Sequence, residues 1–113
     1  MNAKVRSRLE DALYAAELID AWGQQYERES LESDQLVESA FIRQFEVIGE
    51  ALRVVRSRDD DVDTYFPRIH EWIGLRHQLI HEYRDVDFSL LWHYIVTDIP
   101  ELISDLKAIL ASR

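Results

Sequence analysis

Four side chains able to do chemistry lie in the short segment 76–83: Arg76, His77, His81 and Tyr83. Histidine gives and takes protons near neutral pH, because its unperturbed pKa is about 6.5. Arginine stays charged and presents planar N–H donors that fit a phosphate or a carboxylate. A proton-transfer group beside a permanent cation is typical of a site that moves a proton while it stabilises developing negative charge.

Arg76 interrupts an apolar helical stripe. At about 100° per residue, Arg76 and Tyr83 lie on the same side as five apolar residues, which are Ile69, Trp72, Ile73, Leu79 and Ile80. Burying an unpaired guanidinium is costly, so Arg76 requires a carboxylate, a water-filled cleft or an anionic ligand. Two interpretations stay open: a structural ion pair, for which Glu50 is a candidate, and a site for an anion.

Three histidines, His70, His77 and His81, form a second stripe beside the apolar one. Each can be an ordinary surface or half-buried side chain. Imidazoles on one helical face can also bind zinc or another divalent metal. The Glu of a His-Glu-x-x-His zinc site is absent, however, because Gln78 follows His77. We therefore expect no metal and no other cofactor.

Arg76 and His81 point roughly 140° away from each other on an ideal helix, because they are five residues apart. They converge if the helix unwinds near Tyr83, or if a second copy of the chain brings its own motif to the same place. A twofold interface places the same helix of both subunits together. The spacing thus raises the possibility that function depends on a homodimer.

The elements that must hold these side chains are helices, predicted from apolar residues at three- and four-residue steps. The first spans about residues 3–26. The second follows a cap at Ser33 or Asp34 and ends where the acidic segment 59–63 begins. Gly49 lies in the middle of this second helix at a cost of about 1 kcal/mol relative to alanine, which indicates close approach of a neighbouring helix.

Two further helices complete the predicted fold. The third begins after Pro67 and runs to about Tyr83. The fourth follows a cap at Asp87, and Pro100 is expected to kink or split it. Four amphipathic helices with short connections predict an all-α antiparallel four-helix bundle. Because no linker or repeat divides the chain, residues 1–113 are expected to form a single domain.

Composition narrows the function classes. The 113 residues include no cysteine, which excludes a disulfide scaffold, a thiolate zinc site and a cysteine nucleophile. Thirteen basic residues against 22 acidic ones give a net charge of −9, which argues against a broad phosphate-binding surface. Between residues 64 and 84, three arginines and three histidines accompany only two acids, so a local nucleic-acid site stays compatible with the charge. Without a secretory signal or an apolar run of membrane length, a cytoplasmic protein with no membrane association is expected.

The chain resembles a known family. Residues 76–83, Arg-His-Gln-Leu-Ile-His-Glu-Tyr, are similar to the Arg-x4-His-x-Tyr signature of HepT-like proteins, the HEPN-domain toxins of type VII HEPN/MNT toxin–antitoxin systems. Other similar stretches follow the family's order and lie at residues 40–51, 67–76, 85–87 with Trp92, and 98–102. The resemblance covers about residues 36–110, and the first 30 residues match only in general character.

This resemblance implies an all-helical HEPN bundle, usually dimeric, that acts as a metal-independent endoribonuclease toxin on RNA. Arg76 and His81 match the family's catalytic pair. His77 occupies the auxiliary polar position after the arginine, where Asn is commoner. Tyr83 matches the tyrosine that the antitoxin, a cognate minimal nucleotidyltransferase (MNT), modifies with AMP.

In this function, a 2′-hydroxyl of RNA attacks the adjacent phosphorus while His81 acts as base or acid and Arg76 holds the phosphate. The His81 of a second subunit is the candidate for the opposite proton-transfer role. The alternative is a non-enzymatic helical binding partner of a nucleotidyltransferase. Some relatives of that kind lack the Arg/His motif, so its presence here favours the enzyme.

Overall fold

Side-chain caps set the start of the two longest helices. The structure, a computed structural model, describes residues 1–112. Helix α1 (Ala3–Gln25) begins after Asn2, whose side-chain oxygen accepts hydrogen bonds from two backbone N–H groups of the first turn. Helix α3 (Gln35–Arg58) begins after Asp34 in the same way. Of the two predicted caps, Asp34 is therefore the one used, and α3 ends at the acidic segment as predicted.

A short helix, α2 (Arg28–Ser33), joins them and has no counterpart in the sequence prediction. Its segment is polar apart from Leu31, which is fully buried, and α2 packs against α3 and against α6 (Phe88–His93). A single apolar residue creates no periodicity, so only the packing of Leu31 reveals this helix.

The third predicted helix is α5 (Ile69–His81), which starts after Pro67 as expected. It is preceded by the short helix α4 (Val62–Tyr65). The helix ends at His81, slightly before the predicted end, and a 3-10 turn, Tyr83–Asp85, follows. The side chain of Asp87 then caps α6 by accepting a hydrogen bond from the Leu90 N–H at 3.1 Å.

The last helix is interrupted, as the sequence predicts. A π-helical segment, Tyr94–Asp98, separates α6 from α7 (Ile99–Ser112). Pro100 has no N–H to give to the carbonyl of Val96, and in a regular α-helix its ring would collide with that carbonyl. The wider π turn, in which the Ile99 N–H reaches back to the Tyr94 carbonyl, makes room for the ring.

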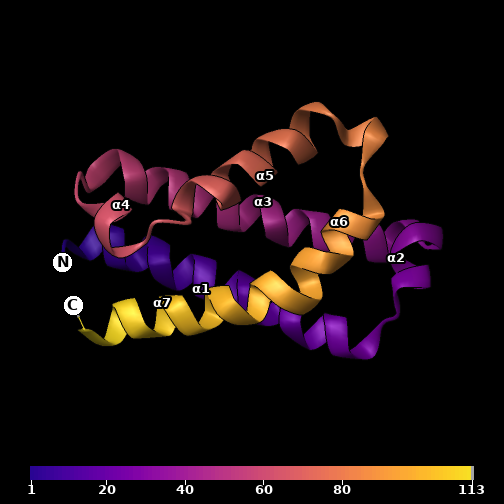
Figure 1. Cartoon of the computed structure of the whole chain (residues 1–113), viewed down its shortest axis with the longest axis horizontal. Helices are drawn as coiled ribbons and strands as arrows, with labels where there is room; N and C mark the ends of the chain where they lie inside the picture. The colour runs from indigo at the N-terminus through magenta and orange to yellow at the C-terminus, as the bar shows by residue number, and fades with distance from the viewer. Residues whose placement is uncertain (113) are drawn as a thin grey trace.

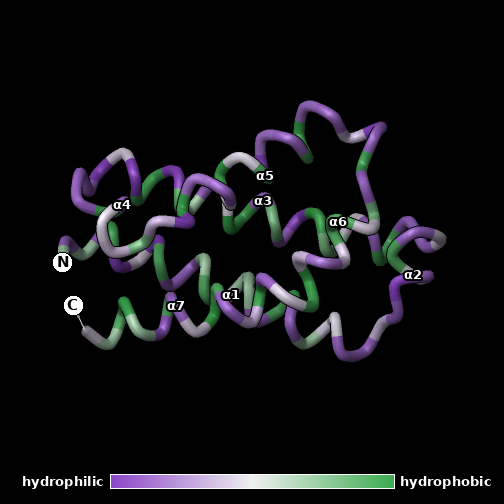
Figure 2. The backbone as a smooth tube through the Cα atoms, in the orientation of Figure 1, coloured by the Kyte–Doolittle hydropathy of each residue, from purple (hydrophilic) through white to green (hydrophobic). Residues whose placement is uncertain are grey.

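The bundle is antiparallel, because α1, α3, α5 and the last helix run in alternating directions (Figure 1). α3 packs against α1 on one side and α5 on the other, and α1 also packs against α7. Hydrophobic and hydrophilic residues alternate along each long helix, which is the pattern of helices with one buried face (Figure 2). The fold is the all-α bundle that the sequence predicts. No helix in the described residues is long and apolar enough to cross a membrane.

An ion-pair cluster fixes the start of α5 against the last helix. The Arg68 guanidinium donates to Glu71 at 2.7 Å and to Asp98 at 2.9 Å, and it lies 3.2 Å from Glu101. These hydrogen bonds to Glu71 and Asp98 raise the pKa of Arg68 further. The Arg68 hydrogen bond also holds the pKa of the Glu71 carboxyl below its ordinary value. The cluster spans α5, the π segment and α7, so it sets where α5 begins.

Candidate active site

Gly49 allows α5 to come very close to α3 at Arg76. A Cβ atom placed on Gly49 would overlap the Cβ of Arg76 and lie 2.9 Å from its Cδ and 3.0 Å from its Cγ. Any side chain at this position would force the two helices apart. The predicted close approach at Gly49 is confirmed, and the neighbour is the aliphatic stem of Arg76 itself.

The Arg76 guanidinium lies beside Glu50 but does not hold that carboxylate alone. Arg76 Nη2 is 3.6 Å from Glu50 Oε1, which is an ion pair but too long for a good hydrogen bond. Arg53 occupies both Glu50 oxygens, donating at 2.9 and 2.8 Å, and this hydrogen bonding lowers the pKa of Glu50. Arg76 is therefore held by charge, and its side chain stays 30% exposed. Both interpretations of Arg76 meet here: an ion pair exists, and donors are left for an anion.

Sequence reasoning missed the role of Arg53. The three-residue spacing between Glu50 and Arg53 on one helix is the signal that identifies such a pair, because residues three apart are neighbours on a helix surface. Arg76 comes from another helix, so the competition between the two arginines for one carboxylate becomes visible only in the packed bundle.

The two histidines of the motif lie together on the exposed side of α5. The rings of His77 and His81 have their centroids 4.3 Å apart and are tilted by 43°. Both residues are exposed, and His81 is the last residue of the helix. His70 does not join them, because its Nδ1 lies 2.9 Å from the Pro67 carbonyl at the other end of α5. In residues 1–112 no group of three side chains is placed to hold a metal ion.

Tyr83 lies outside the apolar stripe that the helical periodicity assigns to it. Since α5 ends at His81, Tyr83 belongs to the following 3-10 turn and its side chain is 64% exposed. The guanidinium of Arg84 lies 5.9 Å from the centre of its ring. The phenol is therefore accessible from solvent, two residues from His81.

Arg76 and His81 diverge within one chain. α5 remains an α-helix through His81, so the unwinding begins too late to rotate His81 toward Arg76. Arg76 lines a groove next to α3, whereas His81 contacts His77 at the exposed face. The helix does unwind near Tyr83, as one of the two predicted routes to convergence requires, but the unwinding begins after His81 and leaves His81 beside His77.

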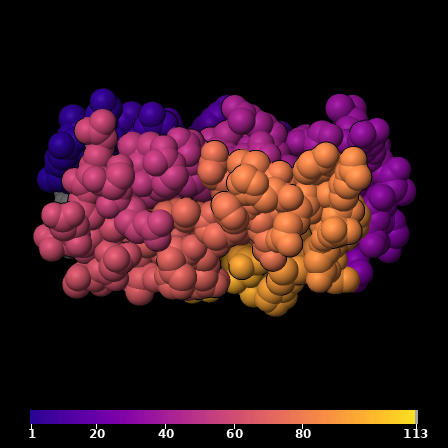
Figure 3. Space-filling model, turned by 90° about the horizontal axis from the view of Figure 1, so that it is seen from above, coloured from indigo at the N-terminus to yellow at the C-terminus, as the bar shows by residue number. Residues whose placement is uncertain are grey.

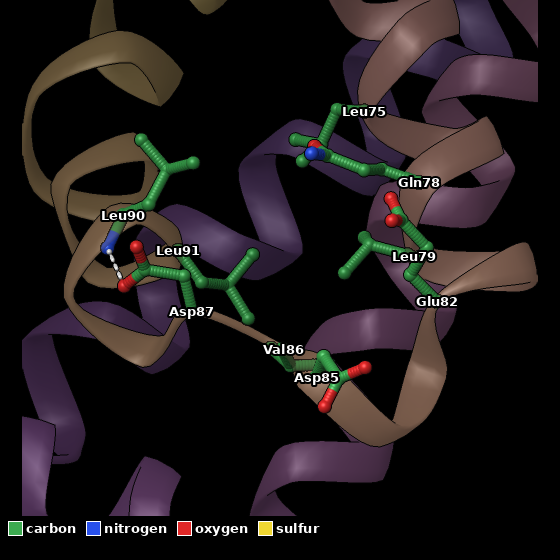
Figure 4. Close-up of a pocket in the computed structure, with 9 residues that line it drawn as sticks. All are labelled: Leu75, Gln78, Leu79, Glu82, Asp85, Val86, Asp87, Leu90 and Leu91. Atoms are coloured by element: carbon green, nitrogen blue, oxygen red, sulfur yellow. Dashed lines mark hydrogen bonds between the residues drawn. The ribbon is translucent and has the colours of Figure 1, made fainter.

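A small pocket of about 120 Å³ lies between the end of α5 and the start of α6 (Figure 4). Its apolar lining comes from Leu75, Leu79, Val86, Leu90 and Leu91. Its carboxylates come from Glu82, Asp85 and Asp87. Val86 packs against the core and so holds the segment that carries Tyr83. The carboxylates disfavour a phosphate here, so this side of α5 is a poor approach for nucleic acid.

The chain is thus an all-helical bundle that presents an arginine and two histidines from one helix. The family model described as "Ribonuclease HepT-like" matches residues 12–109. The chain belongs to this HepT-like ribonuclease family, as its motif suggests. No solved structure matches the chain significantly.

Named relatives agree with this family. "Probable ribonuclease HepT" of Thermococcus cleftensis is 32% identical over 108 residues, covering 90% of this chain and 92% of the relative. "Putative RNase MJ1380" of Methanocaldococcus jannaschii is 29% identical and covers 93% of this chain and 95% of the relative. "Putative RNase TTE0752" of Caldanaerobacter subterraneus is 35% identical over 73% of this chain and 72% of the relative.

Proposed function

We propose that this protein is a metal-independent endoribonuclease toxin of a type VII HEPN/MNT toxin–antitoxin system that works as a homodimer. Membership of the ribonuclease family supports RNA as the substrate. The observation that supports a homodimer is the divergence of Arg76 and His81 on a regular helix. A twofold interface along α5 supplies each Arg76 with the His81 of a second copy.

In the proposed reaction, one His81 removes the proton of a ribose 2′-hydroxyl, and the 2′-oxygen forms a bond to the adjacent phosphorus. The bond between phosphorus and the 5′-oxygen breaks, and the His81 of the second copy donates a proton to that oxygen. Arg76 donates to the phosphoryl oxygens as negative charge builds up on them. His77 has an auxiliary role, and its support is the ring contact with His81 at 4.3 Å between centroids.

The test of this reaction is cleavage of RNA by the purified protein with and without EDTA. We expect the same rate in both, because Arg76 and His81 supply the charge and the proton transfers that a metal would otherwise provide. Electrophoresis of a labelled RNA measures the rate, and mass spectrometry should find a 2′,3′-cyclic phosphate. Cleavage that stops in EDTA and returns with a divalent metal would contradict the proposal. Equal cleavage of a substrate that lacks 2′-hydroxyls would contradict it as well.

We further propose that a cognate minimal nucleotidyltransferase silences the protein by attaching AMP to Tyr83. The exposed phenol supports this, because a modifying enzyme must reach the hydroxyl. The transferred group adds bulk and a negative charge two residues from His81, and both oppose the arrival of an RNA phosphate.

Co-expression with such a nucleotidyltransferase is expected to add AMP to Tyr83, to stop RNA cleavage and to restore growth. Tyr83→Phe should stay unmodified, active and toxic. Peptide mass spectrometry and growth curves measure both effects. The matched control is Tyr14→Phe, because Tyr14 is 67% exposed and so offers an equally accessible phenol. An inactivated protein with an unmodified Tyr83 would count against the proposal.

A further inference from the structure

A groove of about 440 Å³ runs along α3, with α1 and α5 as its walls. Six of its lining residues matter here: Arg8 and Tyr14 from α1, Arg43 and Glu50 from α3, and Arg76 and Ile80 from α5. In Figure 3, α4, α5 and the segment after α5 cover the face in view, and α1 lies along one edge. Arg76 thus belongs both to the motif and to a larger cleft built from three helices.

The groove departs from the charge of the protein as a whole. The chain carries a net charge of −9. Three arginines line the groove, Arg8, Arg43 and Arg76, and a fourth, Arg53, lies outside the lining but binds the lining residue Glu50. Three carboxylates also line it, those of Asp11, Glu46 and Glu50, and the one on Glu50 is already bound by Arg53. An anion is therefore repelled less in this groove than it would be if the net negative charge of the chain were spread evenly over the surface.

Arg8 and Arg43 have donors to spare. Within residues 1–112 neither guanidinium makes a hydrogen bond or an ion pair, although Arg8 is close enough to Glu50 to lower its pKa. Arg8 is half-buried and Arg43 is exposed. Arg8 from α1, Arg43 from α3 and Arg76 from α5 thus present one cation from each helix of the groove, and cations lining a groove are what an anionic nucleic-acid backbone requires.

Tyr14 adds a flat apolar surface to the same cleft. Its side chain is 67% exposed although it belongs to a helix whose other face is in the core. Single-stranded nucleic acids bind where basic side chains follow the backbone and aromatic rings stack on bases. The groove contains both kinds of group.

We propose that this groove binds the single-stranded RNA next to the bond that is cut, with Arg8 and Arg43 on neighbouring phosphates and Tyr14 stacked on a base. The proposal rests on the proposed ribonuclease function and extends it, because it assigns the path of the RNA away from Arg76. Among the described residues, the pocket on the other side of α5 has three carboxylates and no basic residue in its lining, whereas three arginines offset the three carboxylates of the groove, so the groove is the favourable direction for that path.

Binding is measured in a His81→Ala background, so that RNA stays intact, by fluorescence anisotropy with a fluorescein-labelled single-stranded RNA of about ten nucleotides. Arg8→Gln and Arg43→Gln should each raise Kd by about tenfold. Each should also reduce the slope of log Kd against the logarithm of the salt concentration by about 0.7. Arg56→Gln is the matched control, because it removes the same charge from an exposed part of α3 outside the groove lining. It should leave both values close to those of the background.

Tyr14→Ala should weaken binding by about tenfold, and Tyr14→Phe should not, because phenylalanine keeps the stacking surface.

In the cleavage-competent protein, Arg8→Gln/Arg43→Gln should raise KM and leave kcat within about twofold, with circular dichroism confirming an intact fold. The groove proposal would be overturned if Arg56→Gln weakened RNA binding as much as Arg8→Gln or Arg43→Gln, or if the double variant bound RNA as the background does. In either case, RNA cleavage by the wild type would leave the proposed ribonuclease function standing. The groove proposal would also be overturned if light scattering showed that the double variant is a monomer while the wild type is a dimer, since the groove would then be a subunit interface. Arginine-dependent binding without wild-type cleavage would support the groove and overturn the ribonuclease. A wild type that neither binds nor cleaves RNA would overturn both.

Discussion

Replacing His81 with alanine is expected to reduce RNA cleavage by roughly a hundred- to ten-thousandfold, which is the usual contribution of a general acid or base. In the proposed dimer the effect should lie toward the upper end, because one substitution removes both the base and the acid. Arg76→Ala should cost about a hundredfold or more, since it removes the charge that stabilises the phosphoryl oxygens. Initial rates on a labelled RNA, with circular dichroism to confirm folding, measure both losses.

His70→Ala is the matched control for His81, because His70 lies on the same helix but contacts the Pro67 carbonyl far from the motif. It should cleave RNA at the wild-type rate. His77→Ala should fall between the two, because it removes only the ring that contacts His81. Wild-type cleavage by His81→Ala or by Arg76→Ala would contradict the assignment.

Co-expression of Arg76→Ala with His81→Ala asks whether the site is shared between subunits. A mixed dimer keeps one intact Arg76 and one intact His81, and these come from different chains. If the two residues meet across a twofold interface, the mixed dimer regains one Arg76–His81 pair and the mixture should cleave RNA faster than the average of the two parents, but slower than wild type because only one of the two His81 side chains remains. If each chain has its own complete site, every site in the mixture lacks one group and no gain is expected.

Gly49→Ala is expected to destabilise the protein by about 1–3 kcal/mol and to lower kcat by up to about a hundredfold. The added methyl would overlap the Arg76 Cβ, so α5 must move away from α3, and overpacking of this kind has that cost. The same movement displaces the guanidinium, and a shift of about 1 Å in a catalytic group is enough for the loss of rate. Urea unfolding and initial rates measure the two effects separately.

The other two glycines provide controls for stability and for position. A methyl group at Gly74 would meet no atom of the described residues within 4 Å, so Gly74→Ala, at an exposed position of α5, should stabilise the chain by about 1 kcal/mol. At Gly23 a methyl would lie 2.7 Å from Ile95 Cγ2, far along the bundle from Arg76. Gly23→Ala should therefore destabilise the fold without lowering kcat. If Gly49→Ala loses stability but cleaves as Gly23→Ala does, Gly49 does not position Arg76.

The helices and the motif could be predicted from the order of the residues alone. Apolar periodicity, the caps at Asp34 and Asp87 and the break near Pro100 all appear in the structure, because each depends on residues within a few positions of one another along the chain. The same local character explains why α2 escaped prediction: Leu31 is its only buried residue, and its partners lie elsewhere in the chain.

The surroundings of Arg76, by contrast, became known only from the packed bundle. Its stem packs on Gly49, and its carboxylate neighbour Glu50 is already held by Arg53. The groove adds side chains from α1 that are more than sixty residues away in sequence. Helical spacing predicts the face on which a residue lies, but it carries no information on which face of another helix will meet it. That choice depends on how closely α1, α3 and α5 pack, and the absence of a side chain at Gly49 sets the distance at the site.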